Sequence, residues 1–174
     1  MNAKNNCTDA KQGVIRSPKL TTQILMDKAF FFPEGLPAFE AVQQFIFACK
    51  PETAPFIFMR ALDPAHLGFV CIDPFLICPG FKLDLSNADT AFLGITNPEE
   101  ILILSIVTPS QNVRQTTANL QSPLVINLRA HRGRQIIGAE HNYPVRYSIW
   151  EALKGLAQEA QTTAADTERK RSAA

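Results

Sequence analysis

The chain has 174 residues, of which 46% are hydrophobic and 19% are charged. This length and apolar content suit one domain with a buried core, and they exclude a chain that is disordered throughout. The longest apolar run, residues 101–107, is far shorter than the ~20 residues that a membrane span requires, so the sequence predicts no membrane-spanning helix.

The net charge of +1 is unevenly distributed along the chain. Residues 1–22 carry four basic side chains and one acidic side chain, whereas residues 23–150 carry nine basic and eleven acidic ones. Proteins that bind nucleic acids normally present a basic stripe to the phosphates. The slightly acidic central region therefore disfavours direct nucleic-acid binding by the folded part.

The N-terminal residues and the cysteines both indicate a cytoplasmic protein. Residues 1–9 are polar and lack the apolar stretch of a secretory signal. The cysteines show no CxxC spacing, and no histidine lies near them at a spacing typical of metal ligands. In a reducing compartment, Cys49, Cys71 and Cys78 are expected to be small buried hydrophobic residues.

Residues 1–20 lack hydrophobic periodicity, which predicts a disordered basic tail. From residue 21 onward, short apolar runs alternate with proline and glycine turns, and the first of these runs predict strands at residues 24–26, 29–32, 45–49, 56–62 and 67–72. The four-residue link between the last two runs predicts a hairpin that turns at residues 63–66.

The middle of the chain predicts one short helix and several further strands. Ser86 and Asp89 have the spacing of a helix N-cap and its acidic partner, and Gly94 can end the helix, so we expect a helix near residues 87–93. Residues 101–108 are apolar at nearly every position, which predicts a strand buried on both faces. Further strands are expected at residues 115–120 and 124–128, and Arg132-Gly133 is expected to turn a second hairpin between residues 128–131 and 134–138. Residues 145–147 predict a last extended piece.

The C-terminal part predicts an amphipathic helix over residues 149–160. Ser148 and Glu151 have the spacing of a capping box, and apolar residues recur behind them at helical spacing. The apolar face of this helix either packs on the domain or receives a partner. Residues 161–174 are expected to form a solvated tail.

Short strands separated by proline and glycine turns, with no strand–helix–strand alternation, predict a mainly β fold, either a barrel or a sandwich with one or two added helices. None of the common catalytic motifs is present in the sequence. Arg129, His131, Arg132 and Arg134 gather near the predicted second hairpin. They form either a site for an anion or acidic partner, or a charged tip that blocks edge-to-edge association.

Five segments of the chain resemble the flagellar assembly factor FliW family, in the order of that family. They are residues 32–40 (FPEGLPAFE), 69–74 (FVCIDP), 119–127 (NLQSPLVIN), 133–137 (GRQII) and 143–146 (YPVR). The resemblance covers about residues 23–147. The sequence departs from the family pattern at Ala38, where glycine is usual, so that turn is not expected to need a positive φ angle. It also has Ser122 where alanine is usual, and it is less acidic than many members.

The resemblance implies a small, partly open β-barrel of antiparallel strands over residues 21–148. It also implies a non-enzymatic regulatory protein without a cofactor, monomeric on its own, that binds flagellin before export. When flagellin is depleted, such a protein binds CsrA and relieves its block on flagellin mRNA translation; neither nucleic acid nor membrane is a direct partner. The alternative is a barrel that binds a small molecule or a flavin, in which the twelve phenylalanines line a pocket.

Two groups of charged residues are candidates for partner contacts. Glu34 and Glu40 are expected to be acidic contacts for a basic partner, and Arg129, Arg132 and Arg134 are the basic candidates for an acidic one. Such charges usually affect on-rate and specificity more than affinity. The remaining motif residues are expected to be structural, with Phe39 in the core: Gly35, Pro37, Phe39, Asn119, Pro123 and Asn127.

Overall fold

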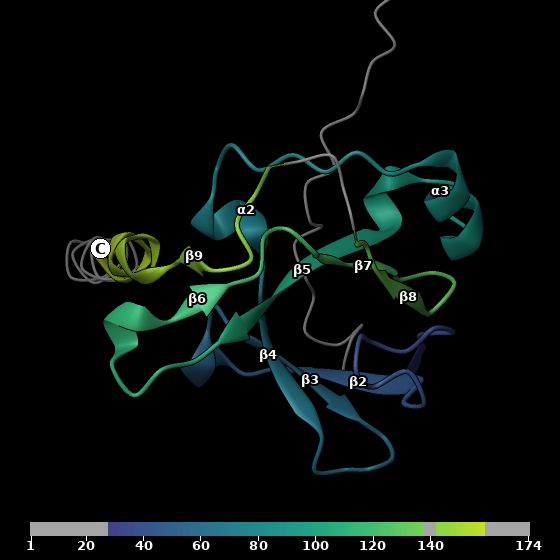
Figure 1. The fold of residues 1–174 in the computed structure, drawn as a ribbon, viewed down its shortest axis with the longest axis horizontal. Helices are drawn as coiled ribbons and strands as arrows, with labels where there is room; N and C mark the ends of the chain where they lie inside the picture. Colours follow the sequence, from purple (N-terminus) through teal and green to yellow (C-terminus); the bar gives the residue numbers. More distant parts are fainter. Residues whose placement is uncertain (1–27, 138–141, 159–174) are drawn as a thin grey trace, which may run out of the picture.

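A closed ring of strands forms the centre of the protein (Figure 1). The structure, a computed structural model, describes residues 28–137 and 142–158. Seven strands pair in the order β4-β3-β2-β1-β8-β7-β5, and β5 pairs again with β4. The mainly β barrel is therefore confirmed, but the ring is closed rather than partly open. One of its pairings, β1 with β8, is parallel.

The strands of the barrel are short. The ring contains β1 (Phe30–Phe31), β2 (Gln44–Cys49), β3 (Ile57–Ala61), β4 (Gly68–Ile72), β5 (Ile101–Thr108), β7 (Leu124–Asn127) and β8 (Arg132–Gln135). Outside the ring, β6 (Thr117–Ala118) pairs with β5, and β9 (Tyr147–Ser148) pairs with β6. The hairpin that turns at residues 63–66 is confirmed as β3–β4. The expected strand at residues 24–26 lies outside the described residues.

The second hairpin turns earlier than the sequence predicted. Residues 128–131 form the turn, and Arg132 and Gly133 lie inside β8. The reversal occurs there because the side chain of Asn127 accepts the N–H groups of Arg129 and Ala130, and because His131 adopts a left-handed conformation with φ +49°.

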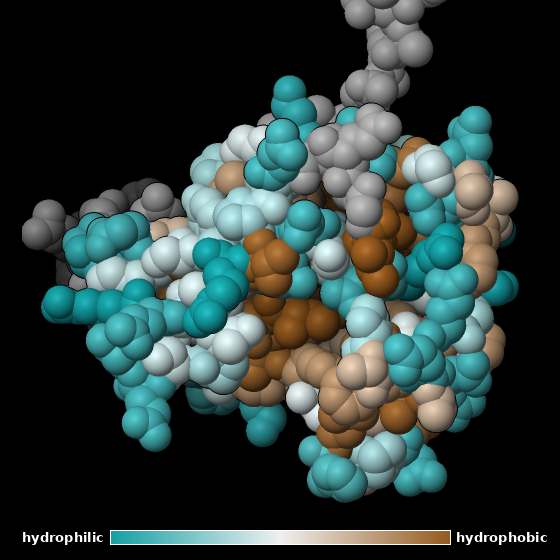
Figure 2. Space-filling view, viewed as in Figure 1, coloured by the Kyte–Doolittle hydropathy of each residue, from teal (hydrophilic) through white to brown (hydrophobic). Residues whose placement is uncertain are grey.

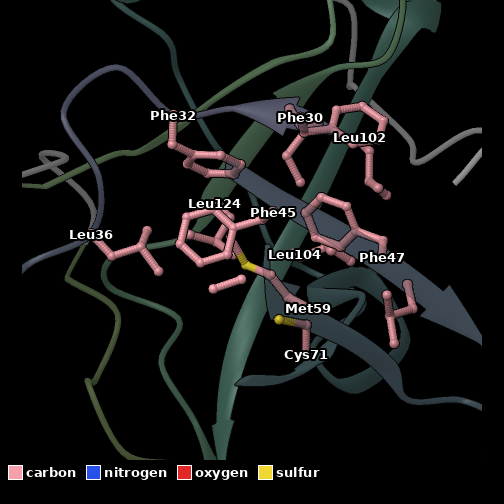
Figure 3. Packing of buried hydrophobic residues seen from close by; sticks show 13 residues of the cluster. Phe30, Phe32, Leu36, Phe45, Phe47, Met59, Cys71, Leu102, Leu104 and Leu124 are labelled. Atoms are coloured by element: carbon pink, nitrogen blue, oxygen red, sulfur yellow. The ribbon is translucent and has the colours of Figure 1, made fainter. Parts of the chain in front are cut away.

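The longest strand, β5, separates two hydrophobic cores, as expected for a strand buried on both faces. Its alternate residues Leu102 and Leu104 point into the barrel, where they pack among phenylalanines (Figure 3). Ile101 and Ile103 belong to the second core, outside the ring. This alternation follows from the period of two in a strand, and it explains the nearly continuous apolar run of β5.

The barrel interior is filled with aromatic side chains. The rings of Phe30 and Phe47 pack edge to face at 5.3 Å, and those of Phe32 and Phe45 do so at 5.2 Å. Such edge-to-face pairs add to the stabilisation that comes from burial alone. These four of the twelve phenylalanines that the small-molecule alternative assigned to a pocket therefore pack against one another instead.

The second core lies between the outer surface of β5 and the helices. Figure 1 shows α2 (Pro74–Ile77), α3 (Asn87–Leu93) and the helix at residues 150–158 on the side of β5 and β7, away from β2 and β3. Ile77, Leu93 and Ile149 are buried in this core, and Ala152 and Leu153 pack against it. The apolar face of the C-terminal helix thus packs on the barrel. Three short 3-10 turns complete the described chain, at Pro51–Thr53, Pro98–Glu100 and Val113–Gln115.

The helix ends agree with the sequence in α3 and differ at the C-terminal helix. In α3, the Ser86 hydroxyl accepts the N–H of Asp89, and Gly94 ends the helix with φ +64°. At the C-terminal helix, Ser148 lies in β9, where it pairs with Thr117 of β6, and does not cap the helix. The helix begins at residue 150, and the carbonyl of Ile149 accepts its first helical hydrogen bond. The expected end at residue 160 and the expected tails at 1–20 and 161–174 lie outside the described residues.

The sequence analysis did not predict α2, although a signal for it is present. Asp73 caps this helix by accepting the N–H of Phe75 at 2.8 Å, and Pro74 occupies the first helical position. Aspartate at the N-cap followed by proline is a common helix start.

The outer surface is not uniformly polar. On the face drawn in Figure 2, apolar side chains gather near the middle, around β4 and β5, and polar side chains surround them.

Within the described ranges, none of the helices is long and apolar enough to cross a membrane. Cys71 lies inside the barrel, and its burial raises the pKa of the thiol to about 12, so this cysteine stays protonated.

Candidate functional site

The loop between β1 and β2 contains the first family-like segment and is held by a dense set of contacts. Gly35 adopts φ +63°, and a Cβ atom placed on it would come within 2.6 Å of backbone atoms of Phe39 and Glu40. Only glycine fits both the conformation and the close approach. The side-chain amide of Gln43 donates to the carbonyl of Pro33 at 2.6 Å, which ties the start of the loop to its end.

Ala38 also adopts a left-handed conformation, with φ +69°. The expectation that alanine relieves this turn of a positive φ angle is therefore wrong. The conformation is held because the carboxylate of Glu40 accepts the N–H of Ala38 at 2.9 Å and the carbonyl of Leu36 accepts the N–H of Phe39 at 2.7 Å. The backbone N–H groups of Glu40 and of Ala38 hold the pKa of the Glu40 carboxyl below its ordinary value.

Replacing Ala38 with glycine is expected to raise the free energy of unfolding by about 0.5 to 1 kcal/mol. The left-handed conformation costs an L-residue about 1 to 2 kcal/mol, and the extra flexibility of glycine in the unfolded chain offsets part of the gain. Urea denaturation of the Ala38→Gly variant measures the difference. An Ala48→Gly variant on β2 serves as a control that should lose stability, and a loss of stability in both variants would contradict the strain at Ala38.

Phe39 lies on the surface, in contrast to the expected core position. Its side chain is 38% exposed, and its ring packs edge to face on Phe69 at 5.6 Å. Leu36 takes the buried place instead, with 2% exposure. Pro37 and Glu40 are exposed beside Phe39. The loop therefore presents an aromatic ring, a proline and a carboxylate in fixed positions.

Two of the predicted contact residues, Glu34 and Arg134, bind each other. Arg134 donates from Nε and Nη2 to the two carboxylate oxygens of Glu34, at 3.0 and 3.2 Å, and from Nη1 to Asp89 at 2.8 Å. A two-pronged pairing of this kind fixes geometry as well as charge. Arg134 thus connects the β1–β2 loop, β8 and α3.

The side chains of the predicted basic group do not lie at one site. Arg132 and Arg134 lie on one side, with their guanidinium groups 4.7 and 4.5 Å from the ring centre of Phe92 on α3. Arg129 lies in the turn, where its side chain is 74% exposed and 3.6 Å from Glu100. The ring of His131 packs against Phe30. Asp89 and Phe92, which the sequence analysis did not single out as site residues, complete the arginine arrangement from α3.

Asn127 joins the end of β7 to the end of α3. Its side-chain nitrogen donates to the carbonyls of Leu93 and Gly94, at 3.1 and 2.9 Å. Its side-chain oxygen accepts the N–H groups of Arg129 and Ala130, both at 3.0 Å. The residue is 1% exposed and its amide makes four hydrogen bonds. Asn127 therefore stabilises the fold and is not exposed for contact with a partner.

The other residues of the NLQSPLVIN segment also have contacts within the fold. The side-chain oxygen of Asn119 accepts the N–H of Ser122 at 3.0 Å and closes the turn before β7. The carbonyl of the buried Pro123 accepts the N–H of Ile136 at 2.9 Å. Within residues 28–137 and 142–158, no group of three or more His, Cys, Asp or Glu side chains is arranged to hold a metal ion.

Comparison with known proteins identifies similar chains. The model of the FliW protein family matches residues 15–149. A flagellar assembly factor FliW from Caldicellulosiruptor saccharolyticus is 32% identical over 136 residues, which cover 78% of this chain and 89% of that protein. The corresponding factor from Moorella thermoacetica is 33% identical over 132 residues, covering 75% and 84%. A crystal structure of the flagellar assembly factor FliW superposes with a TM-score of 0.66 at 33% identity, covering 70% of this chain and 84% of that one.

Proposed function

Because this chain belongs to the FliW family of flagellar assembly factors, we propose that it is a non-enzymatic cytoplasmic regulator that binds flagellin and antagonises CsrA. The observation that carries the proposal is the family match over residues 15–149. The protein is monomeric on its own in this proposal and needs no cofactor. Its folded part carries more acidic than basic side chains, which fits protein partners better than nucleic acid.

The proposed regulation is a negative coupling between two protein ligands. If flagellin and CsrA each lower the affinity of the protein for the other, the level of free flagellin decides how much CsrA is sequestered. The coupling is reciprocal, so the same factor must appear whichever partner is added first.

The exposed acidic part of the β1–β2 loop is the proposed contact for CsrA. An RNA-binding protein presents basic side chains to its ligand, and Glu40 offers an exposed carboxylate that stays ionised because backbone N–H groups lower its pKa. The side chain of Glu34 is about half exposed and forms an ion pair with Arg134. Phe39, between these carboxylates in the sequence, supplies an apolar contact at the centre of the loop.

A translation assay tests the antagonism directly. CsrA is added to a cell-free system that translates flagellin mRNA until synthesis is repressed, and the purified protein is then added. We expect synthesis to recover, and we expect added flagellin to repress it again. An mRNA without CsrA-binding sequences is the control and should respond to none of the additions. Continued repression with the protein at roughly tens of micromolar, a concentration that detects binding of about −6 to −7 kcal/mol, would contradict the proposal.

A further inference from the structure

Arg134 of β8 ties the start of the β1–β2 loop to α3. Its Nε and Nη2 atoms donate to the two carboxylate oxygens of Glu34, and its Nη1 atom donates to Asp89. The guanidinium also lies over the ring of Phe92, 4.5 Å from the ring centre. Each nitrogen of the guanidinium therefore already has a carboxylate partner. A carboxylate from another protein would have to displace Glu34 or Asp89 before it could bind Arg134.

The elements that hold this guanidinium are themselves fixed in the fold. Arg134 pairs with Val125 in the middle of the β7–β8 ladder. Asp89 uses its second carboxylate oxygen to accept the hydroxyl of Ser86, the N-cap of α3. The far end of α3 is bound by the side chain of Asn127. Arg134 and Asp89 thus form a rigid support, and the loop is the part that the ion pair with Glu34 positions.

Close backbone contacts connect Glu34 with the exposed end of the loop. The next residue, Gly35, lies so near to Phe39 and Glu40 that a Cβ atom on it would come within 2.6 Å of their backbone atoms. A displacement of Glu34 therefore moves Gly35 against the backbone of Phe39 and Glu40. The position of Glu34 decides where the aromatic ring of Phe39 and the carboxylate of Glu40 are presented.

The exposure of the ion pair indicates a larger effect on binding than on stability. The side chains of Arg134 and Glu34 are 27% and 53% exposed, and ion pairs open to water contribute little to the free energy of unfolding. A two-pronged arginine–carboxylate pair nevertheless fixes the geometry of the groups it joins. A loop that is already ordered avoids the entropy cost of ordering when a partner binds.

We propose that Arg134 is a positioning residue for the β1–β2 loop: by binding Glu34, it keeps Phe39 and Glu40 in the arrangement that CsrA contacts, without contacting CsrA itself. This inference rests on the proposed function, which assigns the loop to CsrA. It makes Glu34 an internal anchor of the loop, whereas Glu40 remains the exposed carboxylate that faces the partner. It also gives Arg134 a role other than the contact with an acidic partner that the sequence suggested.

The test measures calorimetric affinities for CsrA of the wild type, Arg134→Lys, Glu34→Gln and the double variant. Lysine keeps the positive charge but cannot form the two-pronged pair. We expect each single variant to weaken binding about fivefold through the lost order of the loop, with melting temperatures close to that of the wild type. The double variant should be no weaker than either single one, because both changes remove the same contact.

The matched control is Arg114→Lys. Arg114 also lies over an aromatic ring, that of Trp150, but it belongs to the Val113–Gln115 turn between β5 and β6. The substitution therefore removes a stacked guanidinium without touching the β1–β2 loop. This variant should bind CsrA as the wild type does.

Hydrogen exchange of the protein alone gives a second readout. The N–H groups of Phe39 and Val42 donate to the carbonyls of Leu36 and Phe39 within the loop. We expect both to exchange faster in Arg134→Lys and in Glu34→Gln, while the amides of β5 keep their wild-type rates. Unchanged exchange of the loop amides in both variants would contradict the positioning role, whatever the affinity for CsrA.

The contrary outcomes of the binding test differ in what they overturn. If Glu34→Gln weakens CsrA binding and Arg134→Lys does not, Glu34 contacts CsrA directly; the inference is then wrong, while the proposed function stands. Additive losses in the double variant would also overturn the inference, because the two residues would then act separately. A wild type that binds no CsrA contradicts the proposed function, and this inference with it.

Discussion

Replacing Asn127 with alanine is expected to lower the free energy of unfolding by about 4 kcal/mol, since each unsatisfied buried polar group costs about 1 to 3 kcal/mol. The side chain is buried and makes four hydrogen bonds to backbone groups of α3 and the β7–β8 turn. Alanine leaves two carbonyls and two N–H groups without that partner. It also removes the link that positions α3 against β7.

Urea denaturation followed by circular dichroism measures this effect, and Asn119→Ala is the matched control. Asn119 accepts one hydrogen bond, in the partly buried turn before β7, so its replacement should cost about 1 kcal/mol. An equal, small loss in both variants would contradict the central position of Asn127. Asn127→Asp should be similarly damaging, because a carboxylate cannot donate to the carbonyls of Leu93 and Gly94.

Replacing Gly133 with alanine is expected to cost about 3 kcal/mol, at the upper end of the usual range for overpacking. A Cβ atom at this position would clash with the ring of Phe32. Phe32 is itself fully buried and packed against Phe45, so it has little room to move. The added methyl group must displace the ring or push β8 away from β1.

A double-mutant cycle with Phe32→Leu isolates this contact. The smaller side chain frees space beside Gly133. The loss in free energy of unfolding caused by Gly133→Ala should therefore be smaller by at least about 1 kcal/mol in the Phe32→Leu background than in the wild type. Thermal or urea denaturation of the four proteins gives the coupling free energy. Additive losses would contradict a direct clash between residue 133 and the Phe32 ring.

The parts of the fold that depend on local pattern could be predicted from the sequence. The continuous apolar run predicted β5, and the four-residue link at 63–66 between two strand-like runs predicted the β3–β4 hairpin. The cap at Ser86 and the glycine at residue 94 gave both ends of α3. In each case the residues that determine the structure lie within a few positions of one another.

The second hairpin was predicted at the wrong position because both a local cap and a contact with a distant residue decide where it turns. The second hairpin turns before Arg132 because Asn127 caps the turn and because Phe32, which follows β1, requires a glycine in β8. Arg129 therefore lies in the turn beside Glu100, whereas Arg132 lies in β8 beside Phe92, although the sequence placed both in one basic group.

The pairing of Glu34 with Arg134 also could not be derived from the sequence. These residues are 100 positions apart, and they meet because β1 and β8 close the barrel in parallel. Each residue was therefore assigned to a different kind of partner. The conformation of Ala38 was also predicted wrongly. An alanine at this position suggested a negative φ angle, whereas the hydrogen bonds that Glu40 and Leu36 accept hold the backbone at a positive φ angle.

The account depends most on mutual exclusion between the two proposed partners. Size-exclusion chromatography of the full chain with CsrA, repeated after addition of flagellin, tests it directly. We expect the protein to co-elute with CsrA, and flagellin to release CsrA while forming its own complex with the protein. A single peak that contains all three proteins, with neither partner weakening the other, would contradict the switch.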